Sequence, residues 1–429
     1  MANRVLGLKE EAKYGTASDN VPDWHQEVSK AKATPNTKPM TYSGGSRSVK
    51  KAKAGVMKPE ASYDMKCDLK RIGHYMKAFL GNYVFTAGGN NTNIHEFWGG
   101  ENTELPSFTG WSTFDIVMKK LVGMLCDSLK LEVGDEFMDG SVEWKYKDET
   151  RILEVPEPAD QKMIPDDTLI AFYDIAILLD SATPPGIVSK FSFEGKNNLN
   201  IDKTIGLGSR KPQTKAKAQK REVTLSIEST LVQETLDLIA KAEYGEVADS
   251  PSECKLYKLP LKLTIHFCED ATDSMEILFP ECIFSVDYEA SDADEIDVKF
   301  ELQTMATKKV TLADGTTEVV TDMYVKLQNN QPKIQPGAPG TANVNFTVQS
   351  DDTTPVPVQG ATVTITNRIT DAKLTSSATS ASGACSIATV PLGSYNVEVK
   401  SSGNDVLNIT PLIVSVNETP ETFVIKVKD

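Results

Sequence analysis

Histidines are the side chains best suited to bind catalytic metals and to move protons near neutral pH. This chain has four of them: His25, His74, His95 and His266. None lies three or four positions from another, the spacing that would place two ring nitrogens on one metal ion from a single helix. The histidines therefore predict no zinc site, and we expect no metal centre.

The stretch HEFWGGENTELPSFTGW, from His95 to Trp111, is the most site-like part of the chain. It combines a histidine with carboxylates, a glycine pair and tryptophans. Acid–base catalysis needs such groups to converge on one substrate atom, and nothing in the spacing forces these carboxylates together. We expect Pro106 to mark the entry to a strand, with Phe108 and Trp111 packed in a core instead of stacked on a ligand.

Cysteines and clustered aspartates are the other candidates for metal or redox chemistry. The chain has six cysteines: Cys67, Cys126, Cys254, Cys268, Cys282 and Cys385. No two of them form a CxxC pair, which favours buried free thiols in a reducing compartment over a zinc or redox site. The loop 291–297, SDADEID, lacks the glycine and the terminal glutamate of an EF-hand, which favours a solvated turn over a calcium site.

The sequence lacks the short motifs that are typical of common enzyme families. The sequence contains no GxSxG elbow, no P-loop and no GxGxxG fingerprint. We therefore predict that the protein is not an enzyme, with no catalytic residue, no metal and no cofactor.

The chain is acidic and long enough for more than one domain. It has 429 residues, 40% of them hydrophobic, and a formal net charge of −15. Chains of this length normally divide into two or more cores, and the negative charge argues against a basic surface that would grip DNA phosphates. The N-terminus has no apolar signal segment, and no run is long enough to cross a bilayer. We expect folding in the cytoplasm and no membrane contact.

Alternating residues predict the β-rich framework that must position any functional surface. In residues 222–228 and 296–302 apolar side chains alternate with polar ones, the pattern of strands with one buried and one solvent-facing side. Apolar side chains at helical spacing predict helices over 69–80, with His74 on the surface, and over 231–244.

Two segments are rich in basic residues and are expected to form an extended arm and a loop. They cover residues 26–58 and residues 197–220. Basic segments in so acidic a chain suggest docking on an acidic neighbour, for which another copy of the chain would serve. The alternative is a solvated, mobile segment. The candidate contact residues are Lys50, Lys51, Lys53, Arg210, Lys211, Lys215 and Lys217.

The composition changes after a segment rich in proline and glycine, residues 328–343. Such a segment is expected to be an extended linker. Residues 344–429 are rich in Thr, Ser and Val and fit about seven short strands, which predicts a small Ig-like sandwich. We therefore divide the chain into residues 1–327, the linker 328–343 and the sandwich 344–429.

Several motifs, in this order, resemble the phage tail tube protein family. They are VLGLKEEAKYGTA, MKAFLGNYVFT, IHEFWGGENTELPSFTGW, KKLVGMLCDSLKLEVGDEF, FSFEGKNNLN, REVTLSIES and a late FPEC. The resemblance covers residues 5 to 329. It implies that residues 114–126, whose pattern fits a helix or a bent strand equally well, form a strand with Gly123 at the bend. The basic segment 26–58 and an acidic excursion at 150–188 depart from the family pattern.

The C-terminal part is similar to the carboxypeptidase-regulatory-like and Cna-B-like Ig sandwiches. The similarity lies in PVQGATVTITN and SASGACSIATVPLGSYNVEVKSSG. The matching residues are Gly360, Ala361, Val363, Gly383, Pro391, Leu392, Gly393, Tyr395 and Val397. This resemblance implies an outward-facing decoration domain without a catalytic site.

The tail tube resemblance implies a mainly β fold of two packed antiparallel sheets with flanking α-helices. Six copies would form a ring in which the sheets join into one closed β-barrel, and stacked rings would form a tube through which DNA passes during ejection. An acidic lumen would repel phosphate. The candidate lumen-facing residues are Glu222, Thr224, Ser226, Glu228, Asp297 and Glu301, with outer solvent as the alternative position.

The same resemblance implies partners and a location. The expected partners are further copies of the chain, the tape measure protein, the tail terminator and the baseplate or distal tail proteins, with transient non-specific contact with viral DNA. The expected location is the virion tail, after assembly in the host cytoplasm. The alternative function is a secreted or virion-surface adhesin, a glycan-binding β-domain protein, which the sandwich permits and the missing secretion signal disfavours.

Overall fold

The computed structural model describes most of the chain. The described residues are 4–15, 22–44, 47–88, 92–100, 104–114, 117–152, 169–179, 187–230, 232–245, 256–266, 273–288, 297–334, 341–352, 354–367, 373–391, 393–401, 406–407, 412–416 and 422–427. The expected aspartate-rich turn before Asp297 and much of the excursion at 150–188 lie outside them. The chain is mainly β, as predicted, with two α-helices among the described residues.

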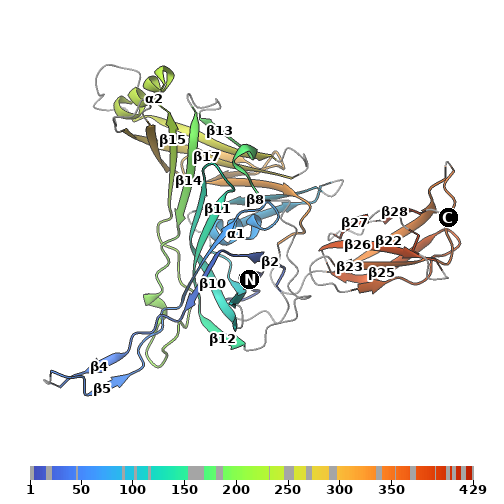
Figure 1. Ribbon diagram of the computed structural model, residues 1–429, viewed down its shortest axis with the longest axis horizontal. Helices are drawn as coiled ribbons and strands as arrows, with labels where there is room; N and C mark the ends of the chain where they lie inside the picture. The colour runs from blue at the N-terminus through green and yellow to red at the C-terminus, as the bar shows by residue number, and fades with distance from the viewer. Residues whose placement is uncertain are drawn as a thin grey trace.

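The first sheet contains the N-terminal strand and lies in the lower part of Figure 1. Its order is β2 (Trp24–Glu27), β1 (Arg4–Glu10), β9 (Phe108–Phe114), β10 (Val117–Val133) and β12 (Asp148–Ile152), all antiparallel. Strand β10 continues beyond this sheet. It bends because Gly123 has a φ of 70° and the pairing register shifts between Cys126 and Ser128. The expected bent strand with Gly123 at the bend is confirmed.

The second sheet is larger, and the later half of β10 lies in its middle. Its order is β3 (Lys30–Thr34), β6 (Glu60–Lys66), β11 (Asp139–Lys145), β10, β14 (Val188–Lys196), β15 (Glu222–Thr230), β18 (Asp297–Thr304) and β17 (Ser274–Tyr288). Along β6 and β15, buried residues alternate with residues that reach solvent. This sheet therefore has one packed face and one wet face, as the alternation in 222–228 predicts.

Strand β17 is long enough to belong to two layers. Its first half pairs with β21 (Tyr324–Asn329), its second half pairs with β18, and β16 (Lys258–His266) pairs along its other edge. Three further strands complete this layer: β13 (Ile175–Leu179) beside β16, then β8 (Asn93–Trp98) and β7 (Asn82–Thr86) beyond β21. The strands thereby close into a barrel.

Helix α1 (Ile72–Leu80) packs inside this framework, against β10 and β8. Every residue of the helix is buried, so its surface has no solvent face. The prediction that His74 lies on the surface is therefore wrong: its ring nitrogen Nε2 lies 3.7 Å from the Asp23 carboxylate. Gly81 ends the helix with a φ of 87° and donates its N–H to the Lys77 carbonyl at 2.9 Å.

Helix α2 (Gln233–Tyr244) lies at the top of Figure 1 and packs on β17. It ends at Gly245, whose φ of 81° is a left-handed conformation that glycine adopts without strain. Both helices expected from apolar spacing are present.

One hydrophobic cluster joins the strands of the barrel to α1. Its largest fully buried side chains include Tyr63, Phe79, Phe97, Phe108, Trp144, Tyr146, Phe191, Phe193, Phe279 and Phe300. Replacing one such aromatic side chain with alanine typically costs about 3–5 kcal/mol of stability, because the cavity left behind closes only in part. This core fixes the positions of the surfaces described below.

A second and separate hydrophobic cluster lies in the C-terminal strands, which Figure 1 draws to one side of the barrel. These strands form two sheets. The three-stranded sheet has the order β25 (Ala384–Pro391), β22 (Thr341–Ser350) and β28 (Thr422–Val427). The four-stranded sheet has the order β24 (Lys373–Thr375), β23 (Thr362–Asn367), β26 (Gly393–Lys400) and β27 (Leu412–Val416). Tyr395 and Phe346 are fully buried between them. The described residues of this part of the chain form these seven strands.

The segment expected as an unpacked linker, residues 328–343, is ordered at both ends. Gln328 and Asn329 still belong to β21, and β22 already begins at Thr341. Between them Ile334 is buried against the barrel core. Side chains of α1, β7 and β8 form hydrogen bonds with backbone groups of Gln331 and Ile334.

Short elements project from the barrel. They are the hairpin of β4 (Met40–Tyr42) and β5 (Lys51–Lys53), the hairpin of β19 (Lys309–Thr311) and β20 (Glu318–Val320), and the 3-10 turns η3 (Phe172–Asp174) and η4 (Asp202–Thr204). The basic segment 26–58 contains the sheet strand β3 and the hairpin β4–β5.

Candidate assembly surfaces

The wet face of the second sheet holds most of the residues expected to face a lumen. On β15 the side chains of Glu222 and Thr224 are exposed, and those of Ser226 and Glu228 are half-buried. Exposed Glu301 lies directly opposite Ser226 on β18. Backbone pairing also puts Asp297 at the start of β18, opposite Thr230. Strand register therefore gathers residues that are far apart in the sequence onto one surface.

The same face continues over the neighbouring strands β10, β14 and β17. Glu194 lies opposite Thr224, Lys130 lies opposite Glu194, and Asp287 lies opposite Lys299. Over these five strands the described lysines of the face are Lys130, Lys190, Lys196 and Lys299. The acidic residues that strand register places on this face are Glu132, Glu194, Glu222, Glu228, Asp287, Asp297 and Glu301. The face is thus mixed in charge, with a small acidic excess.

Each lysine of this face has a carboxylate beside it. Glu132 accepts from Lys130 at 2.5 Å and from Lys190 at 2.7 Å, and these hydrogen bonds lower the pKa of the Glu132 carboxyl. Two further pairs are Lys196 with Glu194 at 2.6 Å and Lys299 with Glu301 at 2.7 Å. A phosphate that approached this face would therefore meet cations that are already neutralised.

The two basic segments lie side by side in one subunit, at the lower end of Figure 1. Arg210 joins them: its Nε donates to the Gly55 carbonyl at 2.8 Å, and its carbonyl accepts from the Met57 N–H at 2.8 Å. Lys58 also pairs with Asp202 at 2.7 Å. No sequence pattern indicated this contact, which fixes the base of the hairpin β4–β5.

The candidate contact lysines divide into two groups. Lys211 pairs with Asp148 at 2.6 Å, and Lys215 lies 3.6 Å from Glu104, so both already have partners in their own chain. Lys50, Lys51, Lys53 and Lys217 are all exposed, and no ion pair to them is found among the described residues. The side chains of the second group are therefore available to contact a neighbouring copy of the chain.

An open polar hollow of about 450 Å³ lies where the basic segments meet the second sheet. Its charged lining is paired: Lys145 lies 3.6 Å from Glu60 and 3.5 Å from Asp127. Since these charges already satisfy one another, the hollow does not present the convergent groups of a ligand site.

In the described parts of the His95–Trp111 stretch, the aromatic side chains expected to pack in the core are buried. His95 is buried on β8, where its Nδ1 accepts from the Tyr83 hydroxyl at 2.9 Å and its Nε2 lies 3.2 Å from the Gln331 carbonyl. Phe108 is buried at the start of β9, and Trp111 is buried on the same strand. Burial lowers the pKa of His95 to about 4, although the hydrogen bond to the Gln331 carbonyl opposes this.

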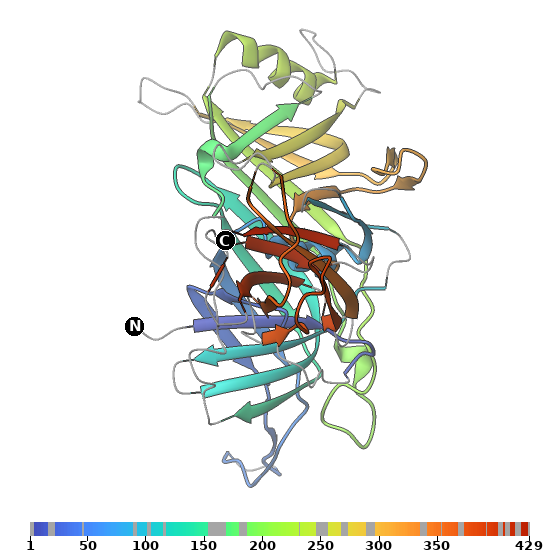
Figure 2. The same cartoon turned by 90° about the vertical axis from the view of Figure 1, so that its right-hand side faces the viewer.

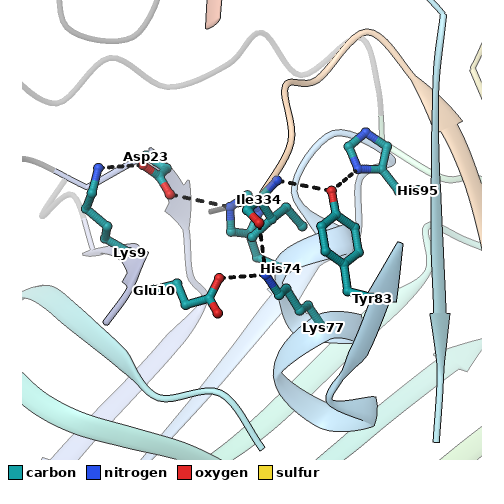
Figure 3. Close-up of polar contacts among 8 residues, drawn as sticks. All are labelled: Lys9, Glu10, Asp23, His74, Lys77, Tyr83, His95 and Ile334. Carbon is teal, nitrogen blue, oxygen red and sulfur yellow. Dashed lines mark hydrogen bonds and ion pairs between the residues drawn. The ribbon is translucent and has the colours of Figure 1, made fainter. Parts of the chain in front are cut away.

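A chain of buried polar contacts joins Ile334 to α1, β7 and β8 (Figure 3). The Lys77 ammonium donates to the Glu10 carboxylate at 2.7 Å and to the Ile334 carbonyl at 2.9 Å. The Ile334 N–H donates to the Tyr83 hydroxyl at 3.1 Å. Burial raises the pKa of Glu10 and lowers that of Lys77, and their mutual attraction opposes both shifts. The contacts fix the point at which the chain leaves the barrel.

Glu11 is a buried residue that accepts several hydrogen bonds, and sequence reasoning missed it. Its carboxylate accepts from the Ser107 and Thr109 hydroxyls at 2.9 Å each. It also accepts from the backbone N–H groups of Gly15 and Gly123 at 2.8 Å each. The motif KEEAKYGTA was the available signal, because Glu11 links this N-terminal motif to the bend in β10.

The described residues contain neither a metal centre nor a membrane span. No group of three or more His, Cys, Asp or Glu side chains in them could hold a metal ion. Within the same part of the chain, no helix has the length and apolar character needed to cross a bilayer. Four cysteines are free thiols: Cys67, Cys126, Cys282 and Cys385. Burial raises the pKa of each of these thiols, which keeps them protonated and unreactive.

Comparison with known proteins supports one family. No curated protein matches the chain. Among solved structures, the crystal structure of a variant of BcpA, the major pilin subunit of Bacillus cereus, is 11% identical, with a TM-score of 0.17 over 71% of this chain and 95% of that chain. The sequence model described as phage tail tube protein matches residues 1–266, which is more than half of the chain. The chain therefore belongs to the phage tail tube protein family, whose members are structural proteins of the virion tail.

Proposed function

We propose that the protein is the major tail tube subunit, in which six copies form a ring and stacked rings enclose a lumen for DNA. The observation that supports this most directly is the wet face of the second sheet. It is continuous over β10, β14, β15, β18 and β17, and its lysines are ion-paired. A wall that DNA passes needs to be polar and to lack free cations, because free lysines would hold the phosphates.

We assign roles to the remaining surfaces from their positions in the fold. The exposed lysines of the hairpin β4–β5 and Lys217 contact neighbouring copies. Residues 1–327 form the tube domain, residues 328–343 connect it to the next domain, and residues 344–429 form an outward-facing Ig-like decoration domain. One observation supports two domains: the C-terminal strands have their own hydrophobic cluster, separate from the barrel core. Ile334 packs with the barrel core, so the start of the connecting segment belongs to the tube domain in packing. A chain truncated after Ile334 should still assemble.

The test is labelling of single cysteines in assembled protein. Thr224→Cys places an exposed thiol on the wet face, and Val424→Cys places one on the C-terminal sandwich, where Val424 is 58% exposed. Each variant is labelled with biotin maleimide and then incubated with streptavidin, before and after assembly. In dispersed subunits both sites should bind streptavidin.

In assembled tubes, electron microscopy should show streptavidin along the outer wall for Val424→Cys and none along the wall for Thr224→Cys. A biotin at Thr224 that binds streptavidin along the outer wall would show that the wet face does not line the lumen. Discrete monomers at every concentration, with no rings or hollow tubes, would overturn the tube function itself and favour the adhesin alternative.

A further inference from the structure

The hairpin β4–β5 combines exposed apolar side chains with positive charge. Met40, Tyr42 and Val49 are 57%, 63% and 58% exposed. Four lysines of the same region are exposed: Lys38, Lys50, Lys51 and Lys53. Large apolar side chains gathered on a projection mark a surface that a partner covers. Because Arg210 holds the base of the arm, the hairpin (residues 38–53, here called the basic hairpin) projects in a defined direction.

A second exposed cluster lies in the turn between β10 and β11, where η3 packs on it. Phe137, Phe172 and Tyr173 are 45%, 51% and 67% exposed, and the rings of Phe172 and Tyr173 meet edge to face at 5.4 Å. The backbone holds the cluster together, since the Phe172 N–H donates to the Glu136 carbonyl at 3.1 Å. The carboxylates of Asp135 and Glu136 are exposed beside the rings. We call these five residues the aromatic-acidic edge.

The two surfaces are complementary but lie apart in one copy. In Figure 1 and in Figure 2 the basic hairpin forms the lower tip of the molecule, and η3 lies in the upper half, next to β13. A contact between them must therefore join two copies. Such a contact uses different surfaces on the two partners, so it repeats from copy to copy, either closing into a ring or extending along an axis.

We propose that the basic hairpin of one copy docks on the aromatic-acidic edge of the next copy along the tube axis. This rests on the proposed tube function and names the contact that stacks one ring on the next. Tyr42 and Met40 cover the rings of Phe172 and Tyr173, and the hairpin lysines approach Asp135 and Glu136. Aromatic rings are the side chains that most often dominate such contacts, and charge pairs set the register.

Disulfide formation between two introduced cysteines tests the contact. Full-length protein carrying Tyr42→Cys and Tyr173→Cys is assembled, oxidised and run on a denaturing gel without reductant, beside the unmodified chain. The double variant should give a ladder of cross-linked chains that passes beyond six copies, because an axial contact does not stop at one ring. Mixed single variants should give dimers only. Val424→Cys with Tyr173→Cys should give no ladder.

The outcomes separate the inference from the function on which it rests. A ladder that ends at six copies places the contact within one ring and overturns the axial assignment. Tubes in the microscope without any ladder overturn the docking of these surfaces and leave the tube function standing. Particles that never form rings or tubes overturn the tube function itself.

A charge exchange gives a second measurement that needs no cross-link. Lys51→Glu or Glu136→Lys alone should raise the protein concentration needed for assembly by about tenfold, and the two changes together should restore it. Both side chains are exposed, so circular dichroism of the dispersed subunits should stay unchanged. Single variants that assemble normally, or a double variant that is not rescued, would rule out this pairing.

Discussion

Acid should weaken the attachment of residues 329–334 to the barrel, because this attachment depends on a neutral histidine. In the neutral ring of His95, Nε2–H donates to the Gln331 carbonyl and Nδ1 accepts from the Tyr83 hydroxyl, which in turn accepts from the Ile334 N–H. A second proton would put a donor at Nδ1, opposite the hydroxyl hydrogen of Tyr83. The proton therefore breaks the order of donors and acceptors that holds the segment.

The expected loss of stability follows from the pKa. Burial lowers the pKa of His95 to about 4, against about 6.5 for a histidine in an unfolded chain. Between these two values the unfolded chain binds the proton and the folded chain does not, so the free energy of unfolding falls as the pH falls from 6.5 to 4 and this contribution then levels off. The difference corresponds to about 3 kcal/mol at full effect.

Urea unfolding at pH 7, 5.5 and 4 measures this contribution when the wild type is compared with His95→Gln. Glutamine keeps a hydrogen-bonding side chain but does not titrate. The wild type should lose about 3 kcal/mol more than the variant between pH 7 and pH 4. The protection factor of the Ile334 amide, which is its hydrogen-exchange rate corrected for the intrinsic pH dependence, should fall over the same pH range more in the wild type than in the variant.

The exposed His266 provides the matched control, since His266→Gln removes a histidine without changing a buried contact. This variant should lose stability with the same pH dependence as the wild type. If His95→Gln and the wild type lose stability equally on acidification, His95 is not held neutral by burial and the reasoning fails.

Three further changes probe the buried groups and the bend. Lys77→Met should lower the free energy of unfolding by about 3 kcal/mol in urea, because it leaves the buried Glu10 carboxylate without its cation; Glu10→Gln in the same chain should recover part of the loss. Gly123→Ala should cost about 1–2 kcal/mol, because φ is 70° and the added Cβ would lie 2.9 Å from the Lys147 Cβ; an unchanged urea midpoint would contradict the bend. Glu11→Gln should cost about 2–4 kcal/mol in thermal and urea unfolding, since four donors lose a charged acceptor.

Local patterns predicted the strands and helices well, because burial repeats along each element. The alternation in residues 222–228 indicated the two faces of β15, and apolar spacing indicated α1 and α2. The surface position assigned to His74 failed for a physical reason. Periodicity identifies the most apolar side of a helix, but it does not show that a second sheet covers the other side, as happens to α1.

The polar hubs were harder to predict, because their partners lie far apart in the sequence. Lys77 meets Glu10 and the Ile334 carbonyl, and the contact with Ile334 spans most of the chain. Asn197 shows the same limit: its side chain donates to the Phe79 carbonyl at 3.0 Å and to the Cys126 carbonyl at 3.1 Å. The motif FSFEGKNNLN, which resembles the tail tube family, contains this asparagine, but the motif does not show which carbonyl groups its side chain binds.

The tail tube resemblance implied an acidic lumen, and if the wet face lines that lumen, its mixed charge requires a different physical account. Over its five central strands the acidic residues that strand register places on the face exceed the lysines by only three, and the lysines are ion-paired. Most of the negative charge therefore lies on other surfaces. DNA phosphates would be kept mobile here mainly because no free cation is offered to them, and only to a small degree by net repulsion. The net charge of the sequence does not show how charges pair locally. This local pairing determines how strongly such a wall would bind DNA.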